Sequence, residues 1–354
     1  MKHANRLLCA ASITALFALG ATPAYAAGTA AGATITNTVT VNFQVGNVAQ
    51  TAQTASNSVT VDRKVNLTIV NLGSTTSVSP GQIAAVTTFQ ITNSSNDTLD
   101  LSLAALNQSG GVAAHGGTDA IDVSNFKYYI DTNNNGAYNP GTDTEITWLD
   151  EVAADTTKTV FVVSDVPISA TNGQVAGIVL TSRAEASGTI GTQGALLTAT
   201  VGANTAGVDT VFADAAGATD SANDGAFSIK GDYTVSAALL SVTKTSVLIS
   251  DPVSGTTNPK AIPGAVMEYC IIVSNATGGA TSTSLSISDP LPTTVTYNSA
   301  YGIFVNGTVT GGTCNSDGAA GGSYSATPTP TVSGGLADLS AGSSETLRFR
   351  VTIN

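Results

Sequence analysis

The most conspicuous shortage in this sequence is of charge. Only 10% of the 354 residues are charged, whereas a soluble domain ordinarily has about 25%. Acidic residues outnumber basic ones by 24 to 12, so a nucleic acid would be repelled and we expect no nucleic-acid partner. Hydrophobic residues make up 42% of the chain, and disorder goes with low hydrophobicity and high net charge. A disordered chain is therefore excluded as well.

Histidine and aromatic residues are also scarce, which argues against catalysis. Beyond residue 26 the one histidine is His115, so a Ser–His–Asp triad or a histidine-based zinc site would depend on that residue alone. Aromatic residues make up 5% of the chain, and we interpret the single tryptophan, Trp148, as a core residue rather than a sugar platform. We therefore expect a non-enzymatic protein.

The first 26 residues have the pattern of a secretory signal peptide. Lys2 and Arg6 supply a positive start, an apolar stretch follows, and Ala24-Tyr25-Ala26 has the small residues of a cleavage site. The apolar stretch is shorter than the about 20 residues that a membrane span requires. No later stretch is long enough either, so we expect no membrane span after cleavage. The sequence predicts a signal peptide over residues 1–26 and a secreted protein, extracellular or at the cell surface.

Apolar residues alternate with hydroxyl or amide residues along most of the remaining chain, which predicts strands. Threonine and valine are β-branched and favour strands over helices, and no run of ten or more residues has a convincing helical pattern. The clearest strand is TITNTVTVNF at residues 34–43. We expect further strands at residues 58–61, 65–70, 86–92, 99–103, 126–130, 145–149, 159–163, 177–181 and 196–201.

The strand pattern predicts an all-β protein built from β-sandwiches. Residues 203–232 have the composition of a loop between domains, and a strand-like run at 233–249 follows. We place an N-terminal β-sandwich region at 27–235 and a C-terminal domain at 236–354. The first region is long for one sandwich, so the protein has two sandwiches, or three if that region divides.

Short motifs in the C-terminal segment resemble a known family. In order they are Val242-Thr243-Lys244-Thr245, Asp251-Pro252, Ile262-Pro263-Gly264-Ala265, Glu268-Tyr269-Cys270-Ile271-Ile272-Val273-Ser274-Asn275, Ile287-Ser288-Asp289-Pro290-Leu291-Pro292, Leu339-Ser340-Ala341-Gly342-Ser343 and the closing stretch 347–353. This set resembles the conserved-repeat domain (domain of unknown function eleven) of bacterial surface proteins, over about a third of the chain. The resemblance implies an immunoglobulin-like fold and a structural or adhesive role outside the cell, without known catalysis.

Local chemistry gives three expectations for the same segment. Pro263-Gly264 predicts a turn into a strand. Alternation places Tyr269, Ile271 and Val273 on one face of that strand. The stretch 289–292, DPLP, lacks two backbone donors, so we expect it to end a strand and carry the chain between sheets.

The best candidate for a binding site is the loop at residues 131–143, DTNNNGAYNPGTD. Its oxygen-bearing residues and its glycine match the first half of a calcium loop, and the expected ligands are Asp131, Asn133, Asn135, the carbonyl of Ala137, and Asp143. The twelfth position holds Thr142 instead of glutamate, and a strand-like run precedes the loop, so it is not an EF-hand. We predict a calcium loop between two strands, with a metal-free hairpin as the alternative.

Other clusters are weaker candidates. Four acidic residues in the presumed interdomain stretch are interpreted as solvated carboxylates rather than a metal site: Asp209, Asp214, Asp220 and Asp224. An isopeptide bond from Lys244 to Asn354 or an aspartate, assisted by Glu268, is permitted by the spacing but not required.

Two cysteines remain after the signal peptide, Cys270 and Cys314. In an exported protein they are expected to pair, which on the chain-entropy model stabilises the fold by roughly 3–4 kcal/mol. The alternative is a pair of buried free thiols.

These observations favour a structural protein of the bacterial exterior, a fibre, coat or matrix subunit that associates with itself or with other surface proteins. One mechanism is strand addition, in which residues 34–43 pair with the sheet edge of a neighbouring subunit. A simpler alternative is that this strand completes its own sheet. The competing function is a calcium-dependent adhesin or glycan-binding module.

Overall fold

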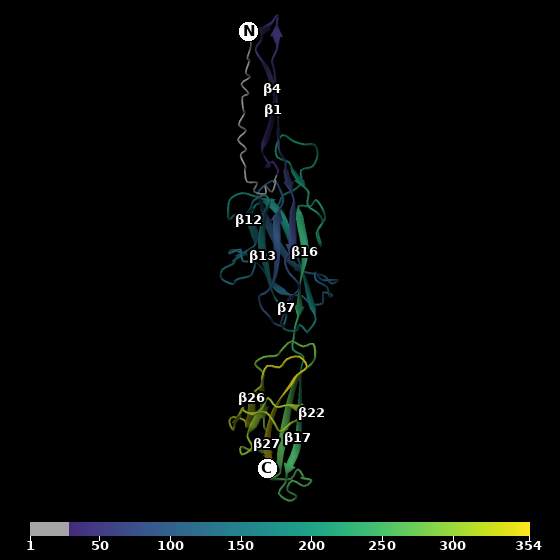
Figure 1. The fold of residues 1–354 in the computed structure, drawn as a ribbon, viewed down its shortest axis with the longest axis vertical. Helices are drawn as coiled ribbons and strands as arrows, with labels where there is room; N and C mark the ends of the chain where they lie inside the picture. Colours follow the sequence, from purple (N-terminus) through teal and green to yellow (C-terminus); the bar gives the residue numbers. More distant parts are fainter. Residues whose placement is uncertain (1–27) are drawn as a thin grey trace, which may run out of the picture.

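The computed structural model describes residues 28–354, which form strands and loops without a helix and therefore contain no helix able to cross a membrane. The predicted signal peptide lies outside these residues. A protruding hairpin, a first sandwich and a second sandwich follow one another along the long axis (Figure 1). The prediction of an all-β protein is confirmed.

The first sandwich consists of two five-stranded sheets with the orders β11-β10-β13-β8-β6 and β12-β9-β14-β16-β7. The strands of the first sheet are β6 (Leu67–Asn71), β8 (Ala85–Asn93), β10 (Ser124–Ile130), β11 (Thr144–Ile146) and β13 (Thr156–Asp165). Those of the second are β7 (Thr76–Val78), β9 (Leu99–Asn107), β12 (Trp148–Val152), β14 (Val175–Ala186) and β16 (Ala226–Val235). One core between them includes Phe89, Leu101 and Ile178, so residues 63–235 form one sandwich.

The strand-like run at 233–249 is divided in the structure. Tyr233 is fully buried in the core of the first sandwich, where its hydroxyl group accepts a hydrogen bond from Ser164 at 3.0 Å. Strand β16 ends at Val235, and the next strand, β17 (Leu240–Ser250), belongs to the second sandwich. The expectation of one continuous run is therefore wrong, because Tyr233 and Val235 at its start are buried in the core of the first sandwich.

Two further expectations about the stretch after β14 are wrong. Residues 196–201 form no strand, since Val201 lies 90% exposed and has no sheet face to cover. Residues 203–232 are not a linker between domains. Within them β15 (Thr210–Phe212) pairs in parallel with β5 (Arg63–Val65), at the side of the first sandwich. Strand β16 also begins inside this stretch.

The second sandwich has a main sheet of order β17-β18-β27-β21-β24, with β20 beside β27, and a smaller sheet of order β19-β26-β25. The main sheet contains β17, β18 (Val266–Asn275), β20 (Val295–Tyr297), β21 (Ile303–Val305), β24 (Ala319–Ala320) and β27 (Ser344–Ile353). The smaller sheet contains β19 (Ser286–Pro290), β25 (Ser323–Ser325) and β26 (Thr331–Gly335).

The local expectations for the second sandwich are confirmed. Strand β18 begins directly after the turn at Pro263-Gly264. Ile271 and Val273 lie in the core, with Tyr269 packed against it. Strand β19 ends at Pro290, and the following strand β20 pairs in the other sheet, so the chain changes sheets at the DPLP stretch.

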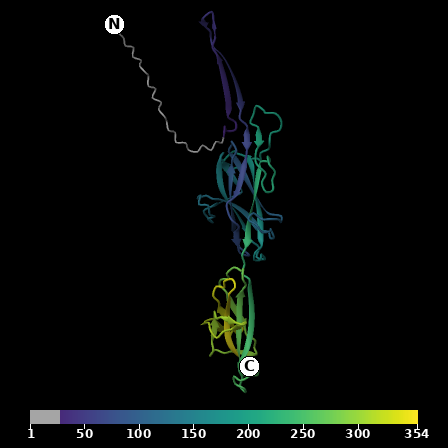
Figure 2. The same cartoon turned by 45° about the vertical axis from the view of Figure 1, so that its right-hand side comes forward.

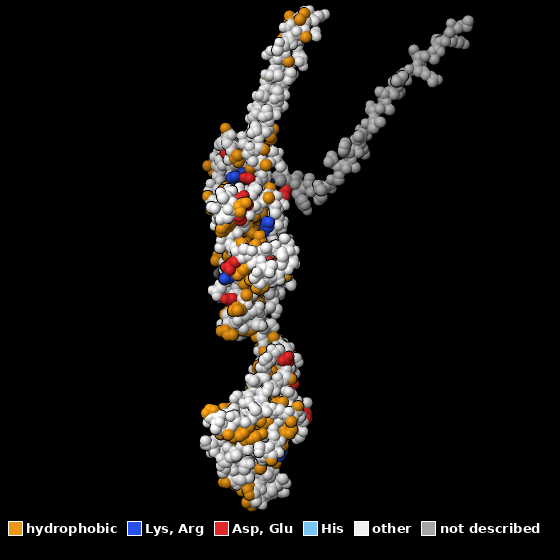
Figure 3. Space-filling model, turned by 90° about the vertical axis from the view of Figure 1, so that its left-hand side faces the viewer, with side chains coloured by type: hydrophobic (Ala, Val, Ile, Leu, Met, Phe, Trp, Pro, Cys, Tyr) orange, Lys and Arg blue, Asp and Glu red, His pale blue; other side chains and the backbone are white. Residues whose placement is uncertain are grey.

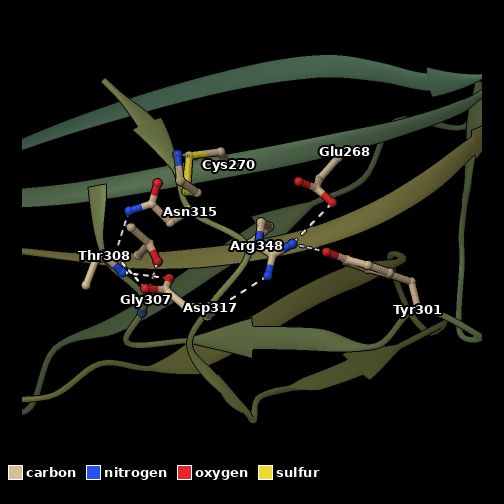
Figure 4. The surroundings of a disulfide bond; sticks show 10 residues. Glu268, Cys270, Tyr301, Gly307, Thr308, Asn315, Asp317 and Arg348 are labelled. Carbon is tan, nitrogen blue, oxygen red and sulfur yellow. Dashed lines mark hydrogen bonds and ion pairs between the residues drawn. A yellow bond between two sulfur atoms is a disulfide. The ribbon is translucent and has the colours of Figure 1, made fainter. Parts of the chain in front are cut away.

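A disulfide joins Cys270 to Cys314, as predicted, with a Cα–Cα distance of 5.7 Å. Cys270 lies on the outer face of β18, and Cys314 ends β23 (Thr313–Cys314), which pairs with β22 (Val309–Thr310). The bond therefore holds the β22–β23 segment onto the outer face of the main sheet (Figure 4).

Beside the disulfide, the same segment covers a buried arginine. The side chain of Arg348 is 5% exposed and donates hydrogen bonds to Glu268 at 3.4 Å and to the carbonyl of Asp317 at 3.2 Å (Figure 4). Hydrogen bonds from the Thr308 hydroxyl and then the Thr308 N–H lower the pKa of Asp317. Because an arginine is costly to bury without partners, the stapled segment supports the ion pair beneath it.

We expect the double variant Cys270→Ser/Cys314→Ser to lose about 3–4 kcal/mol of unfolding free energy in the second sandwich, because the unfolded chain gains entropy. Trp148 is the only tryptophan and lies in the first sandwich, so its fluorescence reports that sandwich alone. Urea unfolding followed by circular dichroism should shift, while the Trp148 transition stays unchanged. Equal stability of the variant and the oxidised protein would contradict this role.

Candidate functional site

The feature least expected from the sequence is a β-hairpin that stands clear of both sandwiches (Figures 1 and 2). Its strands are β1 (Thr34–Val41) and β4 (Gln53–Thr60), and each pairs only with the other among the described residues. A smaller pair, β2 (Gln44–Val45) and β3 (Val48–Ala49), forms its tip. Every side chain of β1 is exposed, so the predicted strand exists but completes no sheet of its own sandwich.

The hairpin has one apolar and one hydroxyl face. Directly opposite residues of an antiparallel pair share a face. The pairs Ile35–Val59 and Val39–Ala55 therefore lie on one face, which continues with Val41. The pair Asn37–Asn57 interrupts this mainly apolar face, and Gln53 lies opposite Val41. The opposite face carries only Thr and Ser in the pairs Thr34–Thr60, Thr36–Ser58, Thr38–Ser56 and Thr40–Thr54. The apolar face is open to solvent, with Val39 57% exposed.

Neither edge of the hairpin carries the features that normally prevent strand pairing. Natural edge strands are protected by charges, proline, bulges or a covering segment. Residues 28–61 contain no charged residue and no proline, and the β1–β4 register is unbroken. The space-filling view accordingly shows no acidic or basic colour on this arm (Figure 3). The hairpin can therefore accept another strand along either side.

The base of the hairpin is fastened to the first sandwich. The N–H of Gly32 donates a hydrogen bond to the carbonyl of Val61 at 2.9 Å, and the N–H of Val61 donates one to the carbonyl of Ala33 at 2.9 Å. The Asn96 side chain donates to the carbonyl of Thr29 at 3.0 Å. The first two bonds close the base of the hairpin, and the bond from Asn96 ties it to the loop after β8.

The predicted calcium loop joins β10 and β11, as expected for a loop between two strands. Ile130 pairs with Thr144, so Asp131 and Asp143 follow at the base of the loop, and both are buried. The carboxylate of Asp131 accepts the N–H groups of Asn135 at 3.2 Å and Gly136 at 2.8 Å. The carboxylate of Asp143 accepts hydrogen bonds from the N–H of Thr132 at 3.1 Å and the N–H of Asn139 at 2.6 Å.

The remaining predicted ligands lie in the same loop. The side-chain oxygen of Asn133 accepts the N–H of Asn135 at 3.1 Å, and that of Asn135 accepts the N–H of Ala137 at 2.8 Å. A carboxylate offers about four acceptor sites, so these bonds leave capacity for a hard cation. The four predicted side-chain ligands all accept hydrogen bonds from backbone groups of the loop, and calcium binding remains a prediction.

Aromatic packing, which the sequence reading missed, holds this loop against the first sandwich. The ring of Tyr138 lies 4.9 Å from that of Tyr129 and 5.8 Å from that of Phe161. Tyr129 donates a hydrogen bond to Glu145 at 3.0 Å, which together with Lys127 lowers the pKa of Glu145. Burial, followed by Tyr138 and Glu145, raises the pKa of Tyr129. Glu145 is therefore engaged outside the loop, and Asp143 is the acid near its end.

Trp148 is not the core residue that we expected. Its neighbour Leu149 is the buried core residue, and alternation turns Trp148 away from that core. Trp148 instead lines a cavity of about 650 Å³ together with Asp131, Asn134 and Asp150. The Nε1 of Trp148 and the Oδ1 of Asp150 are buried there without a hydrogen-bond partner. Both atoms have almost no accessible surface, so they are an unpaired donor and acceptor inside the protein beside the predicted calcium loop.

The other acidic clusters are occupied by backbone groups. In the four-aspartate cluster, Asp214 is buried and accepts the N–H groups of Asp224 and Gly225 at 3.1 and 3.0 Å. Asp209 is buried as well and accepts the N–H of Thr205 at 2.8 Å, so the interpretation as solvated carboxylates in a linker is wrong for both Asp209 and Asp214. A further cluster, unnoticed in the sequence, contains Asp100, Asp150 and Glu151. In this cluster the carboxylate of Asp100 accepts hydrogen bonds from the N–H groups of Glu151 at 2.8 Å and Gly194 at 2.9 Å.

Two further sequence candidates also have structural partners. His115 bonds through Nδ1 to the buried carboxylate of Asp232 at 2.8 Å. Lys244 forms an ion pair with Asp289 at 2.6 Å, which links β17 to β19 across the two sheets. Glu268 lies on the opposite face of the main sheet, with Arg350 at 2.8 Å, so the trio required for an isopeptide bond is not assembled.

Comparisons with known proteins show no family. No family model and no curated protein matches the chain. Among solved structures, the C-terminal domain of the AgI/II polypeptide BspA from Streptococcus agalactiae has a TM-score of 0.32 at 10% identity, covering 82% of this chain and 91% of that one. The CupB6 tip adhesin from Pseudomonas aeruginosa has a TM-score of 0.24 at 12% identity, covering 83% and 91%. Likeness at this level carries no conclusion about function.

We expect calcium to raise the melting temperature of chelated protein and to change the fluorescence of Trp148, because Asp131 borders the cavity that Trp148 lines. Asp131→Asn should abolish both effects, since a neutral amide holds calcium more weakly than a carboxylate. The exposed Asp122 provides the control variant Asp122→Asn, which should respond as the unaltered protein does. If calcium changes neither signal in the unaltered protein, the loop is a metal-free hairpin.

Proposed function

We propose that this chain is a non-enzymatic structural subunit of the bacterial surface, a component of a fibre, coat or matrix that is built by strand pairing between molecules. The observation that carries the proposal is the free hairpin of β1 and β4. An isolated two-stranded hairpin is marginally stable at best in water, and this one keeps an exposed apolar face and two unprotected edges. Such an element gains most from a partner that supplies both backbone hydrogen bonds and apolar cover.

The composition supports the same role. The strands of the hairpin present hydroxyl groups where other surfaces present charges, so its pairing would bury no charged side chain. This avoids the desolvation cost that limits charged interfaces. The linear order of hairpin, first sandwich and second sandwich (Figure 2) suits an extended subunit.

The surroundings of the polar candidates support a role without catalysis. His115 is tied to Asp232. The serine that shares its cavity, Ser228, is hydrogen-bonded to Asp220 instead. A Ser–His–Asp triad requires a hydrogen bond between the serine hydroxyl and the histidine ring, so these residues do not form one.

Electron microscopy and sedimentation of the purified exported protein test this function. We expect assemblies much heavier than one chain in the unaltered protein, with and without calcium. A variant lacking residues 34–60 should remain a single chain and should melt like the unaltered protein, because the hairpin contributes nothing to either core. Unaltered protein that stays a single chain at every concentration would contradict the proposal.

A second candidate function is calcium-dependent glycan binding. The observation that favours it is the cavity that Trp148 shares with Asp131 and Asn134 of the predicted calcium loop. An indole ring can pack against a sugar ring, and polar side chains in the same cavity can bond to its hydroxyl groups.

A glycan array probed with and without calcium tests this second candidate. Binding that requires calcium and is lost in Trp148→Ala would support it. Tyr324→Ala changes an exposed aromatic residue of the second sandwich and serves as the control. Silence of the array under both conditions would count against glycan binding and leave the structural role unaffected.

A further inference from the structure

The lengths of the free strand edges narrow the choice of a partner for the hairpin. The outermost strands of the first sandwich are short: β6 and β12 have 5 residues each, and β7 and β11 have 3. In the second sandwich β19 has 5 residues, β25 has 3 and β24 has 2. Strand β17 has 11 residues and pairs only with β18 among the described strands. Among the edges of the two sandwiches, it is the one long enough to match the 8 residues of β1.

The inner face of β17, which the smaller sheet would be expected to cover, is also exposed at one end. Val242 lies opposite Val273, a core residue of β18, so both side chains stand on the inner face of the main sheet. Val242 is nevertheless 67% exposed, and Leu240, two residues earlier on the same face, is exposed as well. The smaller sheet therefore does not reach over this end of β17, and the inner layer remains open there.

The hairpin is complementary to this open edge in charge and in polarity. The hairpin is uncharged, and the charged residue of β17, Lys244, is already neutralised by Asp289. Ile35, Val39 and Val41 lie on one face of β1, interrupted by Asn37, and can extend the inner layer beyond Val242. Strand β1 is the better of the two hairpin strands for this role, since all its residues except Asn37 are β-branched and fit a pleated sheet.

We propose that β1 of one molecule adds to the edge of β17 in a second copy of this chain. This inference rests on the proposed structural function and names its partner. The hairpin and the second sandwich lie at opposite ends of the molecule (Figures 1 and 2). The hairpin of one molecule therefore cannot pair with β17 of the same molecule.

The proposed contact joins two different surfaces and repeats from copy to copy. Such heterologous contacts produce open chains when the rotation between copies does not close a ring. Both β17 and the hairpin run roughly along the long axis of the molecule (Figure 1). Pairing between them would therefore join the molecules head to tail into a filament.

Charge substitutions on the two surfaces test the proposal by sedimentation velocity of the exported protein. Val39→Lys alters the apolar face of the hairpin, and Val242→Lys alters the open edge. Each should raise the concentration needed for assembly by about tenfold or more, because an unpaired charge would be buried. Leu240→Lys is a second acceptor variant if Val242→Lys unfolds, which circular dichroism would reveal.

The matched controls carry the same charge on the other face of each strand. Thr38 lies on the hydroxyl face of β1, and Val247 lies on the outer face of β17 beside Glu268. Thr38→Lys and Val247→Lys should assemble as the unaltered protein does.

Mixing the two defective variants gives the sharpest result. Val39→Lys keeps an intact acceptor and Val242→Lys keeps an intact donor, so their equimolar mixture should form species of two chains and nothing larger. If Val242→Lys and Leu240→Lys both fold and assemble normally, or if the mixture stays monomeric, pairing with β17 is wrong, although assembly of the unaltered protein would still uphold a structural function. Unaltered protein that never assembles would overturn both.

Discussion

Each β-strand presents two rows of backbone donors and acceptors, and the architecture of this chain depends on how the outer row of each edge strand is treated. The two sandwiches keep nearly all their edges short, so few unpaired groups are exposed at any one place. Strands β1, β4 and β17 are the exceptions. An unpaired edge of this length is a template for another strand unless charge or proline interrupts it, and the hairpin has neither.

The low charge of the chain has a physical meaning in this setting. A hydroxyl-rich strand face is compatible with water and needs no counter-charge. The same strand can be brought against another molecule without stripping water from ions. In the second sandwich the buried Arg348 is paired with Glu268 and the buried Asp289 with Lys244, while the buried Asp251 accepts backbone N–H groups. The composition therefore leaves the hairpin free of the charges that would oppose pairing.

Much of the fold follows from alternation alone, because the side-chain period of two is intrinsic to a strand. It located β8, β9 and β13 and the core face of β18, and cysteine counting correctly predicted the disulfide. Alternation does not reveal what covers a strand. Residues 34–43 have the pattern of a half-buried strand yet stand free. Residues 196–201 have it too, but they form only a single β-bridge, from Leu196 to Glu185. Tyr233 belongs to the core of the first sandwich, although its sequence neighbours continue into the second. Trp148 reaches the predicted calcium loop, and Tyr138 of that loop reaches Tyr129 and Phe161, only through tertiary packing, which no local pattern encodes.

The central claim is that the hairpin is unpaired in the single molecule and becomes paired on assembly, and hydrogen–deuterium exchange measures this most directly. In dilute single chains we expect the amides of β1 and β4 that face outward, and those on the free edge of β17, to exchange rapidly. In assemblies the outward-facing amides of β1 and the edge amides of β17 should become protected together, while the sandwich cores remain unchanged. Hairpin amides that exchange equally fast before and after assembly would contradict the claim.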